Sequence, residues 1–192
     1  SEESNLQING DIDFSEGGQL RSFNLDVSEL GYSKFQVDSI YASDNVFDVS
    51  VDASFLDGRS WLHSFTDNQL VDKDFKKVDQ ASLSYRLSAH LDAFQVSKLG
   101  LMSDVDLSIY QLQGELNRAQ IRGKFANEEV FTFELKPNDG MREFVMSSVD
   151  SGVMFRAFGI ANGFVGGEFL MTGSVSDLGS ISSIISIDDF KF

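Results

Sequence analysis

Hydrophobic and polar residues alternate with a period of two along most of this sequence. In the first such segment, residues 6–14, apolar side chains and one glycine hold the even positions and polar side chains hold the odd ones. Antiparallel strands with one packed and one solvated face give this alternation, whereas buried parallel strands give continuous apolar runs. We therefore predict a mainly β protein. The other alternating segments are residues 23–27, 35–37, 47–53, 83–91, 105–109 and 131–135.

Short groups of turn-forming residues separate the predicted strands. Glu16-Gly17-Gly18 and Gly31 fall between alternating segments, and Pro137-Asn138-Asp139-Gly140 follows the segment at 131–135. An Asp-Gly pair between two alternating runs is typical of a tight β-hairpin. The sequence thus predicts a meander, in which consecutive strands lie side by side.

Two segments depart from the alternation and predict short helices. Between Asp57 and Phe65, the residues Trp61, Leu62 and Phe65 have helical spacing. Between Asp150 and Gly159, Met154, Phe155, Ala157 and Phe158 behave in the same way. Asp150 is positioned as the N-cap of the second helix and Gly159 as its C-terminal stop.

The two predicted helices suggest an internal duplication. Each follows a strand that ends in Val-Asp-small, Val51-Asp52-Ala53 in one case and Val149-Asp150-Ser151 in the other. We therefore expect one β-rich domain over residues 1–192 that is built from two related units, 1–80 and 81–192.

The number of strands exceeds what two short helices can cover. Nine or ten predicted strands present one apolar face each, so the sheet either folds over itself as a closed sandwich or leaves part of that face open. We expect an antiparallel, strongly curved meander sheet, forming a groove or half-open sandwich, with two short helices.

Composition narrows the range of partners. The 192 residues carry a formal net charge of −15, which repels the phosphate backbone of nucleic acids and excludes binding driven by counterion release. No apolar run approaches the roughly 20 residues needed to cross a bilayer. The sequence opens Ser1-Glu2-Glu3 without an initiator Met or a signal peptide, and we expect it to be a segment of a longer protein.

No arrangement of reactive side chains predicts catalysis or metal binding. The chain has no cysteine, and its two histidines, His63 and His90, lie far apart without a zinc-type spacing. There is no Gly-x-Ser-x-Gly elbow for a serine nucleophile. Three carboxylate pairs could serve a glycosidase, but two of them fall on the polar parity of strands, where solubility places acids. The pairs are Asp11/Asp13, Asp104/Asp106 and Asp188/Asp189. We predict that the protein is not an enzyme and has no cofactor.

The last 45 or so residues carry a distinct pattern. A helix with an Asp-x-Gly start and a terminal Gly leads into a Gly-Gly-x-apolar-x-apolar-x-Gly strand, and a further strand closes on an Asp-Phe pair. This pattern resembles the C-terminal region of AsmA-like proteins, especially the YhdP-like branch, and Asp57-Gly58-Arg59 resembles a turn of the same branch. The matching positions are Asp150, Gly152, Phe155, Phe158 and Gly159, then Gly166, Gly167, Phe169, Met171 and Gly173, then Ile185, Ile187, Asp189 and Phe190.

The resemblance implies a periplasmic β-rich body anchored in the bacterial inner membrane and linked to outer-membrane biogenesis and phospholipid movement. It implies a sheet that holds the acyl chains of a phospholipid or other amphiphile and that contacts neighbouring domains of the same chain. The candidate lining residues are Phe131, Phe133, Phe155, Phe158, Phe169, Met171, Ile185 and Ile187.

Two other interpretations remain open. The chain could be a structural or protein-interaction β-module without a ligand, whose sheet edge pairs with adjacent domains. It could also be a carbohydrate-active jelly roll, which would need an exposed aromatic platform beside two convergent carboxylates. The direction in which the apolar parity faces discriminates among these interpretations.

Overall fold

The computed structural model describes residues 6–30, 32–42, 46–59, 84–125, 128–176 and 180–191. Within these ranges the chain is mainly β, as predicted, with eleven strands and the seven-residue helix α2 (Ser151–Ala157). The strands are β1 (Leu6–Phe14), β2 (Leu20–Leu30), β3 (Ser33–Ala42), β4 (Val46–Asp57), β5 (Ser84–Gln95), β6 (Leu101–Leu112), β7 (Glu115–Lys124), β8 (Val130–Asn138), β9 (Met141–Ser148), β10 (Glu168–Val175) and β11 (Ile181–Asp188).

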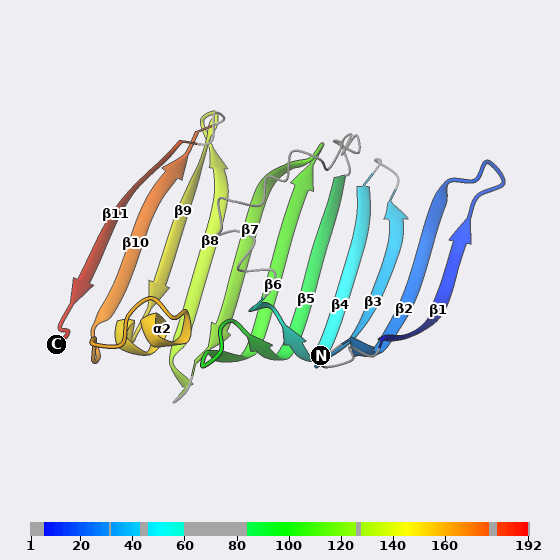
Figure 1. Cartoon of the computed structure of the whole chain (residues 1–192). Coiled ribbons are helices and arrows are strands. Elements are labelled where there is room, and N and C mark those ends of the chain that lie inside the picture. The colour runs from blue at the N-terminus through cyan, green and yellow to red at the C-terminus, as the bar shows by residue number, and fades with distance from the viewer. Residues whose placement is uncertain are drawn as a thin grey trace, which may run out of the picture.

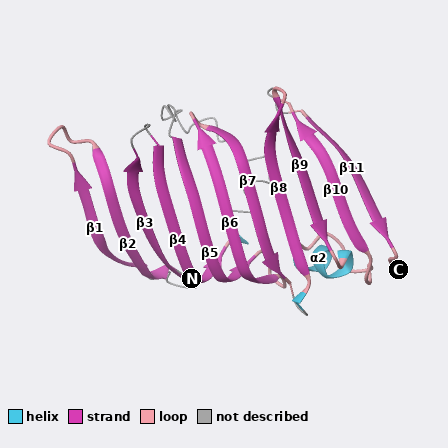
Figure 2. Cartoon of the chain, turned by 180° about the vertical axis from the view of Figure 1, so that it is seen from behind, coloured by secondary structure: helices cyan, strands magenta, loops and turns pink. Residues whose placement is uncertain are grey.

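All eleven strands belong to one open sheet (Figure 1). Their order in space is their order in the sequence, and every neighbouring pair is antiparallel except β4 and β5, which run parallel. The meander prediction is therefore confirmed, while the closed sandwich is not formed by the described strands. Figure 2 shows the same single layer from behind.

The sheet has more strands than the nine or ten expected. The alternation misses β7, because the positions that face the apolar side there include Ala119 and Gly123 instead of large apolar residues. Small residues give no clear two-residue period, although they still pair with Leu135 and Phe131 on β8.

The predicted helix near the C-terminus is confirmed. Asp150 is its N-cap, and the Asp150 Oδ1 atom accepts a hydrogen bond from the backbone N–H of Val153 at 2.8 Å. Gly159 follows the helix with a φ of +70°, a conformation that glycine adopts without strain. The other predicted helix falls mostly outside the described residues, including Trp61, Leu62, His63 and Phe65, and Asp57 itself is the last residue of β4.

The predicted hairpin between β8 and β9 is also confirmed. Asn138 pairs with Met141, leaving Asp139 and Gly140 as a two-residue loop. Both loop residues have positive φ, +43° and +79°, as a type I′ turn requires. The division into units 1–80 and 81–192 stays a prediction.

Candidate functional site

One face of the sheet carries an apolar row that crosses all eleven strands. The row consists of residues that are paired in register from each strand to the next, and no member has a charged or hydrogen-bonding side chain. We call this the middle row and the side that carries it the apolar face. Ten gaps of about 4.8 Å make it about 48 Å long. Its members are Gly10, Leu25, Val37, Val51, Ala89, Leu107, Ile121, Phe133, Met146, Met171 and Ile185.

A second row runs beside the middle row on the same face. It is apolar from Ile12 on β1 to Gly173 on β10, with Ser39 on β3 as the single polar interruption before it ends at Ser183. Ser39 is only 2% exposed, and its hydroxyl has no hydrogen-bond partner among the described residues. Its remaining members are Phe23, Val49, Leu87, Ile109, Ala119, Leu135 and Phe144.

The apolar face is most exposed at its two lateral edges. Ile12 on β1 is 55% exposed and Ile185 on β11 is 57% exposed. Between them, the middle-row side chains from Leu25 to Met171 are half-buried, so they lie between core and solvent. A continuous apolar surface of this length is typical of a binding or interaction surface.

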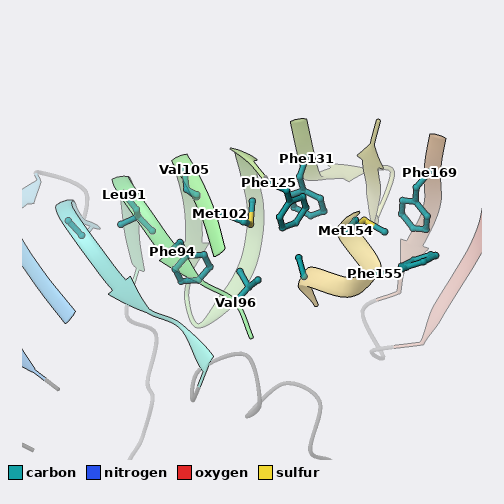
Figure 3. Packing of buried hydrophobic residues seen from close by; sticks show 12 residues of the cluster. Leu91, Phe94, Val96, Met102, Val105, Phe125, Phe131, Met154, Phe155 and Phe169 are labelled. Atoms are coloured by element: carbon teal, nitrogen blue, oxygen red, sulfur yellow. The ribbon is translucent and has the colours of Figure 1, made fainter. Parts of the chain in front are cut away.

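Helix α2 covers one end of this face, across β8 to β10 (Figures 1 and 2). Beneath it, the rings of Phe125, Phe131 and Phe158 form a triangle with centroids 5.6 to 5.8 Å apart. Phe155 of the helix contacts Phe169 of β10 in an edge-to-face arrangement, with the ring centroids 5.7 Å apart (Figure 3). These contacts close the core at this end, because aromatic edges pack favourably against aromatic faces.

The residues of the C-terminal motif meet around α2. The Ser151 N–H donates to Gly167 O at 2.6 Å, and the Ser151 hydroxyl donates to Gly166 O at 2.8 Å. Gly166 and Gly167 both have positive φ, +68° and +89°, which explains why glycine is needed there. Asp189, with a φ of +56°, ends β11 in a bend that brings the ring of Phe190 to within 5.4 Å of Phe164.

Two further glycines let α2 approach its neighbours, Gly152 the loop that follows the helix and Gly100 the turn between β5 and β6, and the role of Gly100 was not predicted from the sequence. A Cβ atom on Gly152 would lie 2.5 Å from the carbonyl oxygen of Phe164. A Cβ atom on Gly100, in the turn between β5 and β6, would overlap the carbonyl group of Ala157 at the end of the helix. Nothing in the local pattern around Gly100 indicates this role, since its neighbour is distant in sequence.

The eight candidate lining residues fall into three groups. Phe131, Phe155, Phe158 and Phe169 pack the helix onto the sheet, and the first, second and fourth are buried. Ile187 is half-buried beside Phe169, its partner on β10. The other three, Phe133, Met171 and Ile185, belong to the middle row, so the lining prediction now rests mainly on them.

The opposite face, which we call the polar face, is acidic over β1 to β6. One of its rows reads Asn9, Asp26, Gln36, Asp52, His90 and Asp106 across these strands. The Nδ1 atom of His90 lies 2.9 Å from an Asp106 carboxylate oxygen, and this hydrogen bond raises the pKa of His90 above its usual 6.5. The charges of Asp106, Asp92 and Asp52 also raise the pKa of His90, whereas desolvation lowers it.

Three carboxylates of the predicted pairs, Asp104, Asp106 and Asp188, are engaged with their neighbours. Lys124 Nζ donates to Asp104 at 2.9 Å and also contacts Glu128 at 2.8 Å, while Asp106 holds His90. Asp188 lies 3.1 Å from the Ser186 hydroxyl. Two shallow hollows are lined mostly by polar-face residues, one beside Asp11 and Asp13 and one beside Asp106 and Arg122.

The Asp57-Gly58-Arg59 turn is held by its own ion pair. Arg59 Nη2 lies 2.6 Å from Asp57 Oδ2. The hydrogen bond from the Arg59 side chain lowers the pKa of Asp57. This turn lies at the end of β4, at the same end of the strands as α2 (Figure 1).

Within the described ranges, no group of three or more His, Asp or Glu side chains is arranged to hold a metal ion. No helix in the described part of the chain is long and apolar enough to cross a membrane. Comparisons with protein-family models, with characterised proteins and with solved structures find no match to this chain.

Proposed function

We propose that this chain is a non-enzymatic periplasmic domain of an AsmA-like envelope protein and contributes an apolar β-sheet groove to phospholipid transport. The observation that carries the proposal is the middle row, which offers an unbroken apolar path over eleven strands. The resemblance of the C-terminal motif supplies the family, the envelope location and the inner-membrane anchor of the full-length protein.

In this proposal the acyl chains lie along the apolar face and the headgroup stays in water at its open side. Burial of methylene groups supplies about 0.8 kcal/mol for each CH₂ fully removed from water. A chain of about sixteen carbons that buries half of its surface thus gains about 6 kcal/mol. Because a bilayer buries the same chain more completely, the sheet does not trap the lipid, as transfer between membranes requires.

The charge distribution supports the same orientation of the lipid. The polar face carries the acidic rows of β1 to β6, and these repel a phosphate headgroup. The middle row carries no charge and therefore does not repel the phosphate headgroup. An anionic amphiphile is therefore directed to the apolar face of the sheet.

Photo-crosslinking in cells tests the proposal with a matched pair of positions. Leu107 and Ser108 are neighbours on β6 that face opposite sides of the sheet. A benzophenone amino acid at position 107 is expected to capture phospholipid, whereas the same group at 108 is not. Equal labelling at the two positions, or labelling of neither, contradicts the proposal.

Native mass spectrometry of the gently purified chain gives an independent test. Replacing Ile12 by Asn places a polar group on the apolar face, and replacing Ile40 by Asn does so on the polar face, where the side chain is 68% exposed. We expect Ile12→Asn to lower the fraction of lipid-bound protein and Ile40→Asn to leave it unchanged. Absence of bound phospholipid in the unmodified chain would argue against the groove.

The second candidate function is an interaction module that binds protein through its sheet edge. The observation that favours it is the exposed, regular strand β11. The two functions separate when the benzophenone amino acid is also placed on β11, because an interaction module captures protein there and no lipid at position 107.

A further inference from the structure

The two edges of the sheet differ in how well they resist pairing with another strand. On β1, the register shifts between Gln7 and Ile8 and again between Asp13 and Phe14, and the exposed acids Asp11 and Asp13 point from the polar face. Irregular pairing and charge are two devices that keep edge strands from associating. Edge β1 is therefore protected.

Edge β11 has no register shift, and its single charged residue is Asp188 at its C-terminal end. Every residue from Ile181 to Asp188 pairs with β10 without a register shift. The stretch from Ile181 to Ile187 contains no charged residue and no proline. Among the described strands β11 pairs only with β10, which leaves its outer backbone groups available to a further strand.

Isoleucine side chains are exposed on both faces of β11. Ile184 lies on the polar face and is 76% exposed, while Ile181 and Ile185 lie on the apolar face and are also exposed. A neighbouring strand would cover both sides at once, whereas a ligand on the apolar face would reach only one. The natural cover for this edge is thus another β-strand.

We propose that β11 pairs with β11 of a second copy of this chain, antiparallel and about a two-fold axis at Ile184. In this register Ile184 lies opposite its own copy, Ile185 opposite the partner's Ser183, and Ile181 opposite the partner's Ile187. Residues directly opposite in an antiparallel pair point to the same side, so both apolar faces lie on one side of the joined sheet. Asp188 falls opposite the partner's Ser180, and no like charges meet.

The high net charge does not oppose this contact. Most acids of the polar face lie on β1 to β6, and β6 is five strand spacings, or about 24 Å, from β11. Charges separated by more than the Debye length of about 8 Å at physiological salt are largely screened. Strand β11, whose single charged residue is Asp188, can therefore associate although each copy carries −15.

Sedimentation equilibrium over micromolar to sub-millimolar concentrations tests the pairing without reference to lipid binding. We expect the unmodified chain to dimerise, and Ile184→Lys and Ile184→Glu each to remain monomeric, because like charges then meet on the axis. An equimolar mixture of the two variants is expected to recover the dimer. The matched control is Ile40→Lys, which changes an exposed polar-face isoleucine of an interior strand and should dimerise normally.

Cysteine crosslinking tests the register itself, since the chain contains no cysteine. Oxidation of Ile184→Cys should link two copies in high yield, and oxidation of Ile40→Cys should not. A chain that stays monomeric at all concentrations overturns the proposal. So does a dimer that survives Ile184→Lys, or one that Ile184→Cys does not link. Circular dichroism of each variant verifies that the sheet has formed.

Discussion

Gly173 on β10 lies directly opposite Phe144 on β9, and the ring of Phe144 occupies the space that a side chain at position 173 would need. A Cβ atom there would lie 2.6 Å from the ring carbon Cζ of Phe144 and would also overlap the backbone carbonyl oxygen of Ser182 on β11. This pairing explains why the C-terminal motif has a glycine at position 173. The contact between these two residues fixes the position of the second row where it passes from β9 to β10.

Gly173→Ala is expected to destabilise the protein by about 1–3 kcal/mol, since overpacking outweighs the smaller gain from replacing a strand glycine. Urea unfolding measures the change as a lower midpoint at unchanged slope. The control is Gly17→Ala, where the nearest atom to the new Cβ lies 3.8 Å away and no loss is expected. Equal effects at the two sites would contradict the steric explanation.

Ser39→Ala is expected to raise the free energy of unfolding by about 1 kcal/mol. The substitution removes a buried hydroxyl that has no hydrogen-bond partner among the described residues. Ser50→Ala, at an exposed polar-face position of β4, serves as the control and should change stability little. Thermal or urea unfolding distinguishes the two, and a loss of stability in Ser39→Ala would show that the hydroxyl is satisfied.

Asp150→Ala should cost about 1 kcal/mol, because the N–H of Val153 loses its capping acceptor. Asp150→Asn keeps an oxygen at the same place and is expected to retain most of the stability. Hydrogen exchange locates the effect, with faster exchange in α2 and unchanged exchange in β1 to β3. Loss of protection in both regions alike would mean that the cap does not act locally.

His90 is expected to titrate above 6.5, and Asp106→Asn should return its pKa toward that value, because it removes the carboxylate that is hydrogen-bonded to Nδ1. A folded-state pKa raised above the unfolded value stabilises the protein fully below pH 6.5, and this contribution is lost as the pH rises through the folded pKa. The difference in urea midpoint between the original chain and Asp106→Asn should therefore shrink with rising pH. NMR titration in a His63→Gln background follows the single remaining histidine.

Local chemistry made much of the fold predictable from the sequence. The alternation in residues 6–14 and 47–53 predicts β1 and β4, and Asp139-Gly140 predicts the hairpin between β8 and β9. Asp150 and Gly159 predict both ends of α2 because capping depends on neighbouring residues alone. The parallel pairing of β4 with β5 escaped prediction, since it joins segments that are distant in sequence.

The candidate site was harder to predict than the fold. Phe131 and Phe133 have the same parity on β8, yet α2 covers the first, while the second stacks on Phe144 in the open part of the face. Sequence pattern treats the two alike. The position of the helix also involves the close approach of Ala157 to Gly100, which links residues 57 positions apart.

The agreement between spatial order and sequence order has a consequence for biosynthesis. As translation proceeds, the newest strand always docks at the free side of the strand made before it, and no strand has to be inserted between two that are already joined. Proteins fold from the N-terminal side as they emerge from the ribosome. The described strands can thus join the sheet one at a time in the order in which they are made, with β11 following β10.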